Sequence, residues 1–401
     1  MTQFLSAKEA ADALGISLPT LYSYVSRGMI RSEAAEDGQR QRRYYAEDVE
    51  KLLLRKEAVR HPEKLAETAL NWGAPVLESA LTLIQDNQLF YRGHDAARLA
   101  VESTLEAVAA LLWTGERDSA LFAASYPDVR TYLAWLEHLD MPYITPLQRL
   151  QMVLPLMQAD DLGAYDLRPD AVVRTGVRLL HALTLLLAET PTPAASIAET
   201  LQRAWCPDQP EAVLLLNAAL ILCADHELNV SSFTARVVAS SGATPYTVIV
   251  GALSAFQGVK HGGAAERVAA FLREIDTIGD ARRVMADRLR RGELLPGFGH
   301  KLYPEGDVRA TTLFALLQAY EADSEALVQA QTIIAEARQH ANIDLALVIL
   351  CRVLRLPMEK AALIFALGRM VGWIGHALEQ YQEGSMIRPR ARYTGVLPSD
   401  G

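Results

Sequence analysis

Apolar residues recur at three- and four-residue spacing through most of this 401-residue chain, in segments rich in Ala and Leu. That period puts the apolar side chains on one face of an α-helix, so the chain must fold by packing helix against helix. Only short pieces show the two-residue alternation of a strand. We therefore predict an all-α fold. The clearest expected helices are residues 104–113, 171–187, 210–224, 282–289, 324–338 and 357–382.

The net charge and the positions of the cysteines limit the kinds of protein that this chain can be. The formal net charge of −9 argues against a chain that binds nucleic acid along its whole length. Cys206, Cys223 and Cys351 are widely spaced in or near apolar stretches, as expected of reduced, buried thiols. The N-terminus lacks a basic segment followed by an apolar one, and the longest apolar stretch is well short of the roughly 20 residues of a membrane span. These features predict a cytoplasmic protein with no membrane partner.

Residues 1–60 contain helix start and stop signals that indicate a small separate module. Ser6 and Glu9 have the spacing of a capping box that opens a short helix, and Gly15 ends that helix. Ser17 then caps a second helix, which stops before Gly28. Two short helices joined by a tight turn with glycine are typical of a helix-turn-helix.

The module resembles the winged helix-turn-helix of MerR-like and excisionase-like proteins, in which the second helix enters the DNA major groove and the wing contacts phosphates. The alternative is a small interaction or dimerisation module with solvated arginines. The charge favours this alternative, because residues 1–60 hold 10 Lys and Arg against 9 Asp and Glu. The side chains that the resemblance places against DNA are Thr20, Tyr22, Ser23, Arg27, Arg40, Arg42 and Arg43.

Residues 294–309 (LLPGFGHKLYPEGDVR) contain the clearest site signal in the rest of the chain. Gly297 and Gly299 lie in a turn-rich loop whose backbone can approach a ligand closely, because glycine has no Cβ. His300 follows at once, and Arg309 lies nine residues further on. Taken alone, the pattern also fits a surface loop with a solvated histidine.

Four other segments bring polar residues at spacings that, in this order, resemble those of citrate synthase. The likeness runs from about residue 71 to the C-terminus. It implies a large helical domain, about residues 61–230 and 336–401, and a small helical domain, about residues 231–335, in a homodimer. The segments and their polar residues are His226 with Asn229 and Ser231, Lys260 with His261, Asn342 with Asp344, and Arg369 followed by Arg388.

The resemblance implies a condensation of acetyl-CoA with oxaloacetate, followed by hydrolysis of citryl-CoA to citrate and CoA. The methyl group of a thioester is a very weak carbon acid, so its enolate must be stabilised as the proton leaves. Asp344 matches the family's general base, His261 the group that stabilises the enolate, and His300 the group that polarises the ketone. Asp344 is alternatively the N-cap of the apolar helix that follows it.

Oxaloacetate is a dianion, and arginine is the natural partner for its carboxylates. The resemblance assigns them to His226, Arg309, Arg369 and Arg388, with Arg388 reaching in from the neighbouring subunit. Arg369 and Arg388 are alternatively structural ion-pair residues. Asn229 and Ser231 match residues that orient the imidazoles. Coenzyme A is expected as a co-substrate, with no metal and no permanently bound cofactor. Its expected contacts are Leu295, Gly297, Lys301 and Lys260.

Two other functions stay open at this point. Acetyl-CoA and propionyl-CoA differ by one methylene, which a pocket discriminates by only about 1–3 kcal/mol, so a 2-methylcitrate synthase fits the same residues. A DNA-binding regulator that uses a citrate-synthase body as a metabolite sensor fits the two-part organisation. The presence of His261, His300 and Asp344 favours an enzyme, because a sensor needs only to bind.

Overall fold

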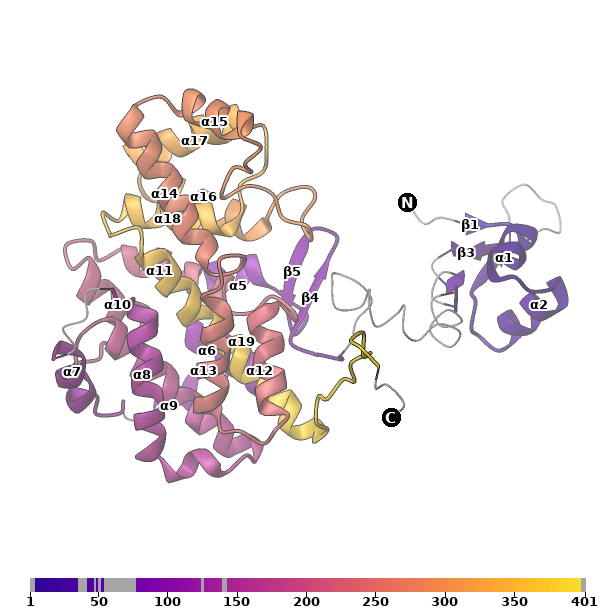
Figure 1. Ribbon diagram of the computed structural model, residues 1–401, viewed down its shortest axis with the longest axis horizontal. Coiled ribbons are helices and arrows are strands. Elements are labelled where there is room, and N and C mark those ends of the chain that lie inside the picture. Colours follow the sequence, from indigo (N-terminus) through magenta and orange to yellow (C-terminus); the bar gives the residue numbers. More distant parts are fainter. Residues whose placement is uncertain are drawn as a thin grey trace. The chain divides into compact units, whose positions relative to one another are not determined.

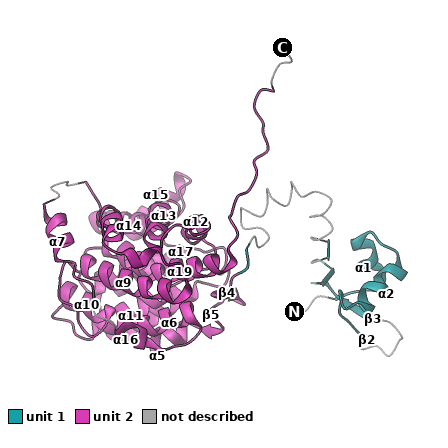
Figure 2. Ribbon diagram, turned by 90° about the horizontal axis from the view of Figure 1, so that it is seen from below, with its two compact units in different colours: residues 1–78 teal, residues 79–401 magenta. Residues whose placement is uncertain are grey.

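The helices expected from the sequence are present in the computed structural model, which describes residues 4–34, 42–46, 48–49, 52–53, 77–123, 126–138 and 143–397. The chain divides into two compact units, residues 1–78 and 79–401 (Figure 2). Each unit has its own hydrophobic core.

The smaller unit begins with the two predicted helices. Helix α1 (Ala7–Leu14) has the expected capping box between Ser6 and Glu9, and it ends at Gly15 in the left-handed conformation. Helix α2 (Leu18–Ser26) is capped by the Ser17 side chain. The core of this unit consists of Ala10, Ala11, Leu14, Leu21, Ile30, Tyr44 and Val49.

A small antiparallel sheet packs with these helices. Its strands are β1 (Phe4–Leu5), β2 (Ser32–Ala34) and β3 (Arg42–Tyr45), in the order β1-β3-β2. The connection between β2 and β3 lies outside the described residues, and so does the predicted DNA contact Arg40. The wing therefore stays a prediction.

The larger unit is built mainly from helices, and the six helices predicted most clearly correspond to α6, α9, α11, α15, α17 and α19. Its helices are α5 (Ala96–Glu102), α6 (Leu105–Thr114), α7 (Arg130–Glu137), α8 (Pro146–Ala159), α9 (Pro169–Leu187), α10 (Ile197–Trp205), α11 (Ala212–Leu222), α12 (Val230–Ala239), α13 (Pro245–Phe256), α14 (Gly263–Ile278), α15 (Ala281–Arg290), α16 (Val308–Tyr320), α17 (Glu325–Ala337), α18 (Ile343–Val353) and α19 (Lys360–Glu383), with 3-10 helices η1 (Ser119–Ala123) and η2 (Leu162–Tyr165).

Helix α19 runs through the centre of this unit and packs against α6, α9, α11, α12, α13 and α18. It is long and apolar enough to cross a membrane, but its most apolar stretch is entirely buried, as in the core helix of a globular fold. Figure 1 shows α14 to α18 gathered at one end of the unit, while α12 and α13 lie with α8 and α9 at the other. The division into a large and a small domain at residue 231 stays a prediction.

Close approach of backbones fixes the position of α19. The Gly372 N–H donates to the Ala224 carbonyl at 2.9 Å, in the segment that follows α11. A Cβ added at Gly372 would lie 2.6 Å from the same carbonyl oxygen, so only glycine fits there. The same approach brings α19 against Cys223 and Asp225, just before His226.

One β-hairpin was not among the predicted elements. Strands β4 (Thr82–Gln85) and β5 (Gln88–Tyr91) pair antiparallel and are joined by the two-residue turn Asp86-Asn87, and β6 (His94–Asp95) extends the sheet. Both turn residues have positive φ, 52° and 60°, which matches a type I′ turn. Asp and Asn tolerate this conformation better than other side chains.

We expect Gly372→Ala to lower the free energy of unfolding by about 3 kcal/mol, because the new methyl group meets backbone that cannot move aside. Urea denaturation followed by circular dichroism measures it. Gly375→Ala is the matched control in the same helix. Its Cβ would meet the Cδ1 atom of Leu81 at 3.0 Å, and that side chain can rotate, so we expect a cost below about 1 kcal/mol. Equal costs for the two variants would contradict the account of Gly372.

Candidate active site

The glycine loop and the start of α18 are joined backbone to backbone. The Gly297 carbonyl accepts from the Asn342 N–H at 2.9 Å, and the Gly299 N–H donates to the His340 carbonyl at 2.9 Å. Gly297 has φ of 87°, and a Cβ there would lie 2.9 Å from the Cβ of Leu345. The two hydrogen bonds bring together the segments that carry His300 and Asp344, which are far apart in the sequence.

Asp344 lies in the first turn of α18, but the N-cap is Asn342, whose side-chain oxygen accepts from the Asp344 N–H at 3.1 Å. The capping role considered for Asp344 is therefore wrong, because the preceding asparagine already fills it. Among the described residues, no group donates a hydrogen bond to the Asp344 carboxylate. Burial raises the pKa of Asp344 to about 6, although the nearby Arg309 cation opposes the rise. The carboxylate is ionised at neutral pH and has a basicity suited to accepting a proton.

His300 is held in one tautomer by the backbone that follows it. The Leu302 N–H donates to His300 Nδ1 at 3.2 Å, so the neutral ring carries its proton on Nε2. Burial and the charge of Arg309 lower the pKa of His300 to about 4. At neutral pH the ring is uncharged and presents an N–H donor.

His261 contacts a buried polar cluster. Its Nε2 lies 2.8 Å from the Ser231 hydroxyl, which also accepts from the Trp373 indole N–H at 3.0 Å. The same hydroxyl lies 2.8 Å from the side-chain oxygen of Asn229, which caps α12. Burial first, and Arg369 second, lower the pKa of His261 to about 4. Ser231 thus contacts His261 directly and Asn229 contacts Ser231, and the orienting role of these two residues stays a prediction.

His226 is buried beside the other histidines. Its Nε2 lies 3.0 Å from the Tyr303 hydroxyl, and its ring centre lies 5.1 Å from that of His300. Burial and the charges of Arg309 and Arg369 keep the pKa of His226 well below its ordinary value. His226 is therefore also neutral near pH 7.

Arg309 forms a buried bidentate ion pair with Asp307. Its Nε and Nη2 lie 2.9 and 2.8 Å from the two carboxylate oxygens. Asp307 also accepts from the Ile343 N–H at 3.0 Å, so it ties the loop to the first residue of α18. Burial alone would raise the pKa of Asp307, but Arg309 outweighs this effect and lowers it.

Arg369 is buried in α19 and is only partly satisfied. Its Nε donates to the Cys223 carbonyl at 2.7 Å, and its guanidinium lies 4.9 Å from the centre of the Phe365 ring. Its Nη2 is buried and has no hydrogen-bond partner among the described residues. A buried, unpaired donor on a cation is costly unless a ligand completes it, so Arg369 is the group most clearly prepared for an anion.

The charges of Arg309 and Arg369 both act on the pKa values of His226, His300 and Asp344, so these groups belong to one site. The chemistry available is a carboxylate base, three neutral imidazoles and two buried cations, of which one is balanced by Asp307. Such a site can bind a dianion, donate hydrogen bonds to carbonyl oxygens and remove a proton from carbon.

Other predicted residues lie outside this cluster. Lys260 and Lys301 are exposed, whereas Leu295 is buried in the loop. Arg388 is exposed in the extended segment that runs out beyond α19 (Figure 2), and it forms no hydrogen bond or ion pair with the described part of the chain.

Several residues of the site were not predicted from the sequence. Tyr303 and Asp307 lie inside the loop that was singled out, and Trp373 lies one helical turn after Arg369, so position next to a predicted residue was the available signal. For Asp225 the only available signal in the sequence was its position next to His226. It accepts from the Thr82 hydroxyl at 2.6 Å and lies 3.2 Å from Nε2 of His376.

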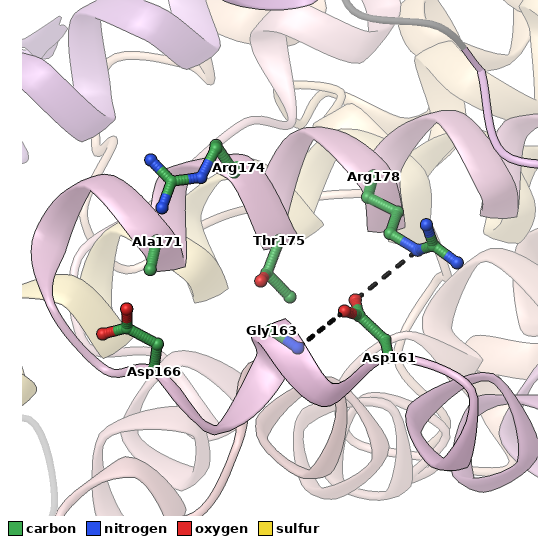
Figure 3. Close-up of a pocket in the computed structure, with 7 residues that line it drawn as sticks. All are labelled: Asp161, Gly163, Asp166, Ala171, Arg174, Thr175 and Arg178. Carbon is green, nitrogen blue, oxygen red and sulfur yellow. Dashed lines mark hydrogen bonds and ion pairs between the residues drawn. The ribbon is translucent and has the colours of Figure 1, made fainter.

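A cavity of about 180 Å³ lies apart from the histidines, between α9 and η2. Figure 3 shows Arg174 and Arg178 of α9 facing Asp161 and Asp166, with none of the predicted site residues among them. Its charges are balanced, and we assign it no role. Among the described residues no cluster of three His, Cys, Asp or Glu side chains has the arrangement of a metal site, and all three cysteines are free and buried.

Comparison with known proteins agrees with this chemistry. Residues 69–390 match the family described as "Citrate synthase, C-terminal domain". This chain belongs to the citrate synthase family. It is an enzyme of the citrate synthase type, with residues 4–57 matching a family described as "Helix-turn-helix domain".

Relatives of this citrate synthase family member include proteins named citrate synthase and proteins named 2-methylcitrate synthase. It is 30% identical over 351 residues to "Citrate synthase 2" of Bacillus subtilis, covering 80% of this chain and 94% of the relative. It is 28% identical over 343 residues to "2-methylcitrate synthase 2" of Corynebacterium glutamicum, covering 78% and 90%. The citrate synthase structure from Thermotoga maritima is similar with a TM-score of 0.69 at 26% identity, covering 82% of this chain and 96% of that one.

The two carboxylates of the site should affect stability in opposite directions. Burial raises the pKa of Asp344 to about 6, so its charge costs stability above pH 6 and this cost shrinks as the pH falls toward 4. We expect Asp344→Asn to stabilise the fold by about 2 kcal/mol at pH 8 and by about half as much at pH 5. Urea denaturation at the two pH values measures this.

Asp307→Asn is the matched control. Loss of this charge leaves the buried Arg309 cation unpaired, so we expect destabilisation of about 3 kcal/mol at pH 8. Destabilisation by Asp344→Asn at pH 8 would show that the burial of its charge is not the dominant effect.

Proposed function

We propose that this enzyme condenses acetyl-CoA with oxaloacetate and hydrolyses the resulting citryl-CoA to citrate and CoA. The observation that carries the proposal is the arrangement around Asp344. An unpaired carboxylate with a pKa of about 6 shares one site with neutral His261 and His300 and with the unpaired guanidinium donor of Arg369.

In the first step, Asp344 takes a proton from the methyl carbon of the thioester, and His261 donates a hydrogen bond to the thioester oxygen as charge builds on it. The Ser231 oxygen accepts from the Trp373 N–H, and its single proton lies toward the Asn229 side-chain oxygen. For His261 to carry its proton on Nδ1 and face the substrate with it, the Ser231 hydroxyl must turn that proton to His261 Nε2, while the Asn229 oxygen keeps the backbone N–H groups of Ser231 and Ser232 as donors.

In the second step, the enolate carbon attacks the ketone carbon of oxaloacetate and a carbon–carbon bond forms. The His300 Nε2–H donates a hydrogen bond to the ketone oxygen. That oxygen takes up one proton to become the hydroxyl of citryl-CoA, which balances the proton that Asp344 removed from the methyl carbon. Arg309, Arg369 and His226 hold the dianion, and we assign Arg388 of a second subunit to the same task. Attack of water on the thioester carbonyl then releases CoA as the thiol and leaves citrate.

Coenzyme A is the expected co-substrate, and this condensation requires no metal. Its adenine is assigned to the backbone of Leu295 and Gly297, and its phosphates to Lys301 and Lys260, whose exposed positions suit a charged ligand. The structure of the Thermoplasma acidophilum citrate synthase, a ternary complex with carboxymethyl coenzyme A and oxaloacetate, has the same fold, with a TM-score of 0.72 at 22% identity and coverage of 82% of this chain and 96% of that one. A cytoplasmic homodimer remains the form in which we expect the enzyme to act.

Release of free thiol tests the reaction directly. We expect oxaloacetate-dependent thiol release from acetyl-CoA at pH 8, and a loss of about 100-fold or more in kcat for Asp344→Asn, because the general base is gone while the fold is kept. A thiol reagent follows the reaction. Release from propionyl-CoA is measured beside it, and a preference for propionyl-CoA would make the enzyme a 2-methylcitrate synthase.

The pH profile is a second measure of the base. Because Asp344 must be ionised, kcat/KM for the thioester should fall about tenfold per pH unit below its pKa of about 6. Exposed Asp86→Asn in the β4–β5 turn is the control and should keep the wild-type rate and profile. No thiol release with either thioester, in a folded protein that still binds oxaloacetate, would overturn the enzymatic proposal.

DNA binding by the smaller unit is a second candidate function. The helix-turn-helix match over residues 4–57 favours it, and so do the exposed side chains of Tyr22 on α2 and of Arg27, the residue that follows this helix. Arg42 is also exposed. Arg43 is less available than predicted, because its guanidinium lies 3.4 Å from the Glu33 carboxylate and over the Phe4 ring.

A gel-shift assay on the full chain tests this second candidate. We expect retarded DNA with wild type, and loss of the shift on Arg27→Glu, which reverses a charge at the C-terminal end of α2, the helix that would enter the groove. Arg98→Glu changes an exposed side chain of α5 in the larger unit, and this control should still shift. An unchanged shift for Arg27→Glu would exclude α2 as the recognition helix.

A further inference from the structure

The β4–β5 hairpin is attached at its base to the segment that carries His226. The Thr82 hydroxyl donates to the Asp225 carboxylate at 2.6 Å, and the Tyr91 hydroxyl donates to the Ile221 carbonyl at 2.9 Å. Tyr91 is completely buried. These bonds anchor both strands of the hairpin to residues just ahead of His226.

The tip of the same hairpin is attached to the loop that carries His300 and Arg309. The Asn87 side-chain amide donates to the Gly306 carbonyl at 2.8 Å and accepts from the Glu305 N–H at 3.2 Å. One amide group thus satisfies a donor and an acceptor on neighbouring peptide units. Asparagine can do this and aspartate cannot, because a carboxylate has no N–H to donate.

The turn holds the Asn87 side chain in a defined direction. Its two residues both have positive φ, and Gln85 pairs with Gln88 immediately behind them. A two-residue turn of this kind fixes the register of the hairpin, so the amide has little freedom once β4 and β5 are anchored.

Besides its contact with Asn87, Gly306 donates its N–H to the Tyr303 carbonyl of the same loop at 3.1 Å. Gly306 has φ of 112°, a conformation of glycine, and it borders a cavity of about 270 Å³ between α16 and α17. Packing around this part of the loop is therefore incomplete. Asp307 follows at once, and its carboxylate sets the position of Arg309.

We propose that Asn87 is a positioning residue for the dianion site: through it the hairpin sets the His300–Arg309 loop against the His226 segment. This inference rests on the proposed function. Because the hairpin is anchored beside His226 and reaches the loop at Gly306, it acts together with the 3.0 Å contact between His226 and Tyr303 to set the separation between the two halves of the oxaloacetate site. Asn87 itself contacts no reacting atom.

Asn87→Gly is the sharpest variant, because it removes both hydrogen bonds and keeps a turn sequence, Asp-Gly, that a type I′ turn favours. Asp86→Gly is its matched control. It alters the neighbouring turn residue to Gly-Asn, which also suits the turn, and leaves the Asn87 amide in place.

Three readouts on the full-length protein are compared between these variants. The first is hydrogen–deuterium exchange of the peptide that spans residues 300–309. The second is steady-state kinetics, with KM and kcat determined separately for oxaloacetate and for the thioester. The dissociation constant of oxaloacetate is measured in the same proteins without thioester.

In Asn87→Gly we expect exchange in residues 300–309 to speed up about tenfold and kcat/KM for oxaloacetate to fall about tenfold, the effect of losing one to two hydrogen bonds. The KM for the thioester and the exchange of the rest of the hairpin should stay within about twofold of wild type. Asp86→Gly should match wild type in every readout. A role confined to hairpin stability would instead speed exchange throughout β4 and β5.

Unchanged oxaloacetate kinetics in Asn87→Gly, or equal changes in both variants, would overturn the inference. If wild type itself shows no turnover, the proposed reaction fails separately. In that case the positioning role is tested by hydrogen–deuterium exchange of residues 300–309 and by the dissociation constant of oxaloacetate. Wild-type values of both in Asn87→Gly would overturn it.

Discussion

The buried carboxylate of Asp307 is the interaction on which the site most depends. It binds Arg309 through both oxygens and also accepts from the Ile343 N–H, so one side chain fixes a cation and joins the catalytic loop to α18. A buried ion pair contributes little net stability compared with apolar packing, yet breaking it costs several kcal/mol. The pair therefore acts as a constraint on geometry, and it sets where His300 and Asp344 can lie relative to Arg309.

The electrostatics of the site follow from burial near cations. Burial raises the pKa of Asp344 and lowers the pKa values of His226, His261 and His300. The charge of Arg369 adds to the lowering for all three histidines, and that of Arg309 for His226 and His300. The pKa of the carboxyl group and the pKa values of the imidazoles are thus shifted in opposite directions. Near neutral pH the site contains one ionised base and three uncharged rings. A dianionic ligand would then give the buried Nη2 atom of Arg369 a hydrogen-bond acceptor.

Much of this organisation was predictable from the sequence. Helix positions follow from apolar periodicity and caps, and the motif around His300 lies within one continuous segment. The contributions of Asn87 and Trp373 were not predictable, because each depends on a contact with residues more than 100 positions away. The capping residue of α18 was missed for a local reason. Asn342 and Asp344 are both good N-cap residues, and only the backbone conformation decides between them.

The tautomer of His300 follows from a neighbour that has no choice of role. The backbone N–H of Leu302 can only donate, so the neutral His300 ring carries its proton on Nε2, and this requires no change of protonation when substrate binds. The tautomer of His261 depends on Ser231, whose oxygen accepts from the Trp373 indole and whose single proton can lie toward Asn229 or toward His261. A donor whose proton is already in place stabilises developing charge without reorganisation. The His300 donor is thus set by a group outside the reacting atoms, and Asp344 is left to make the proton transfer.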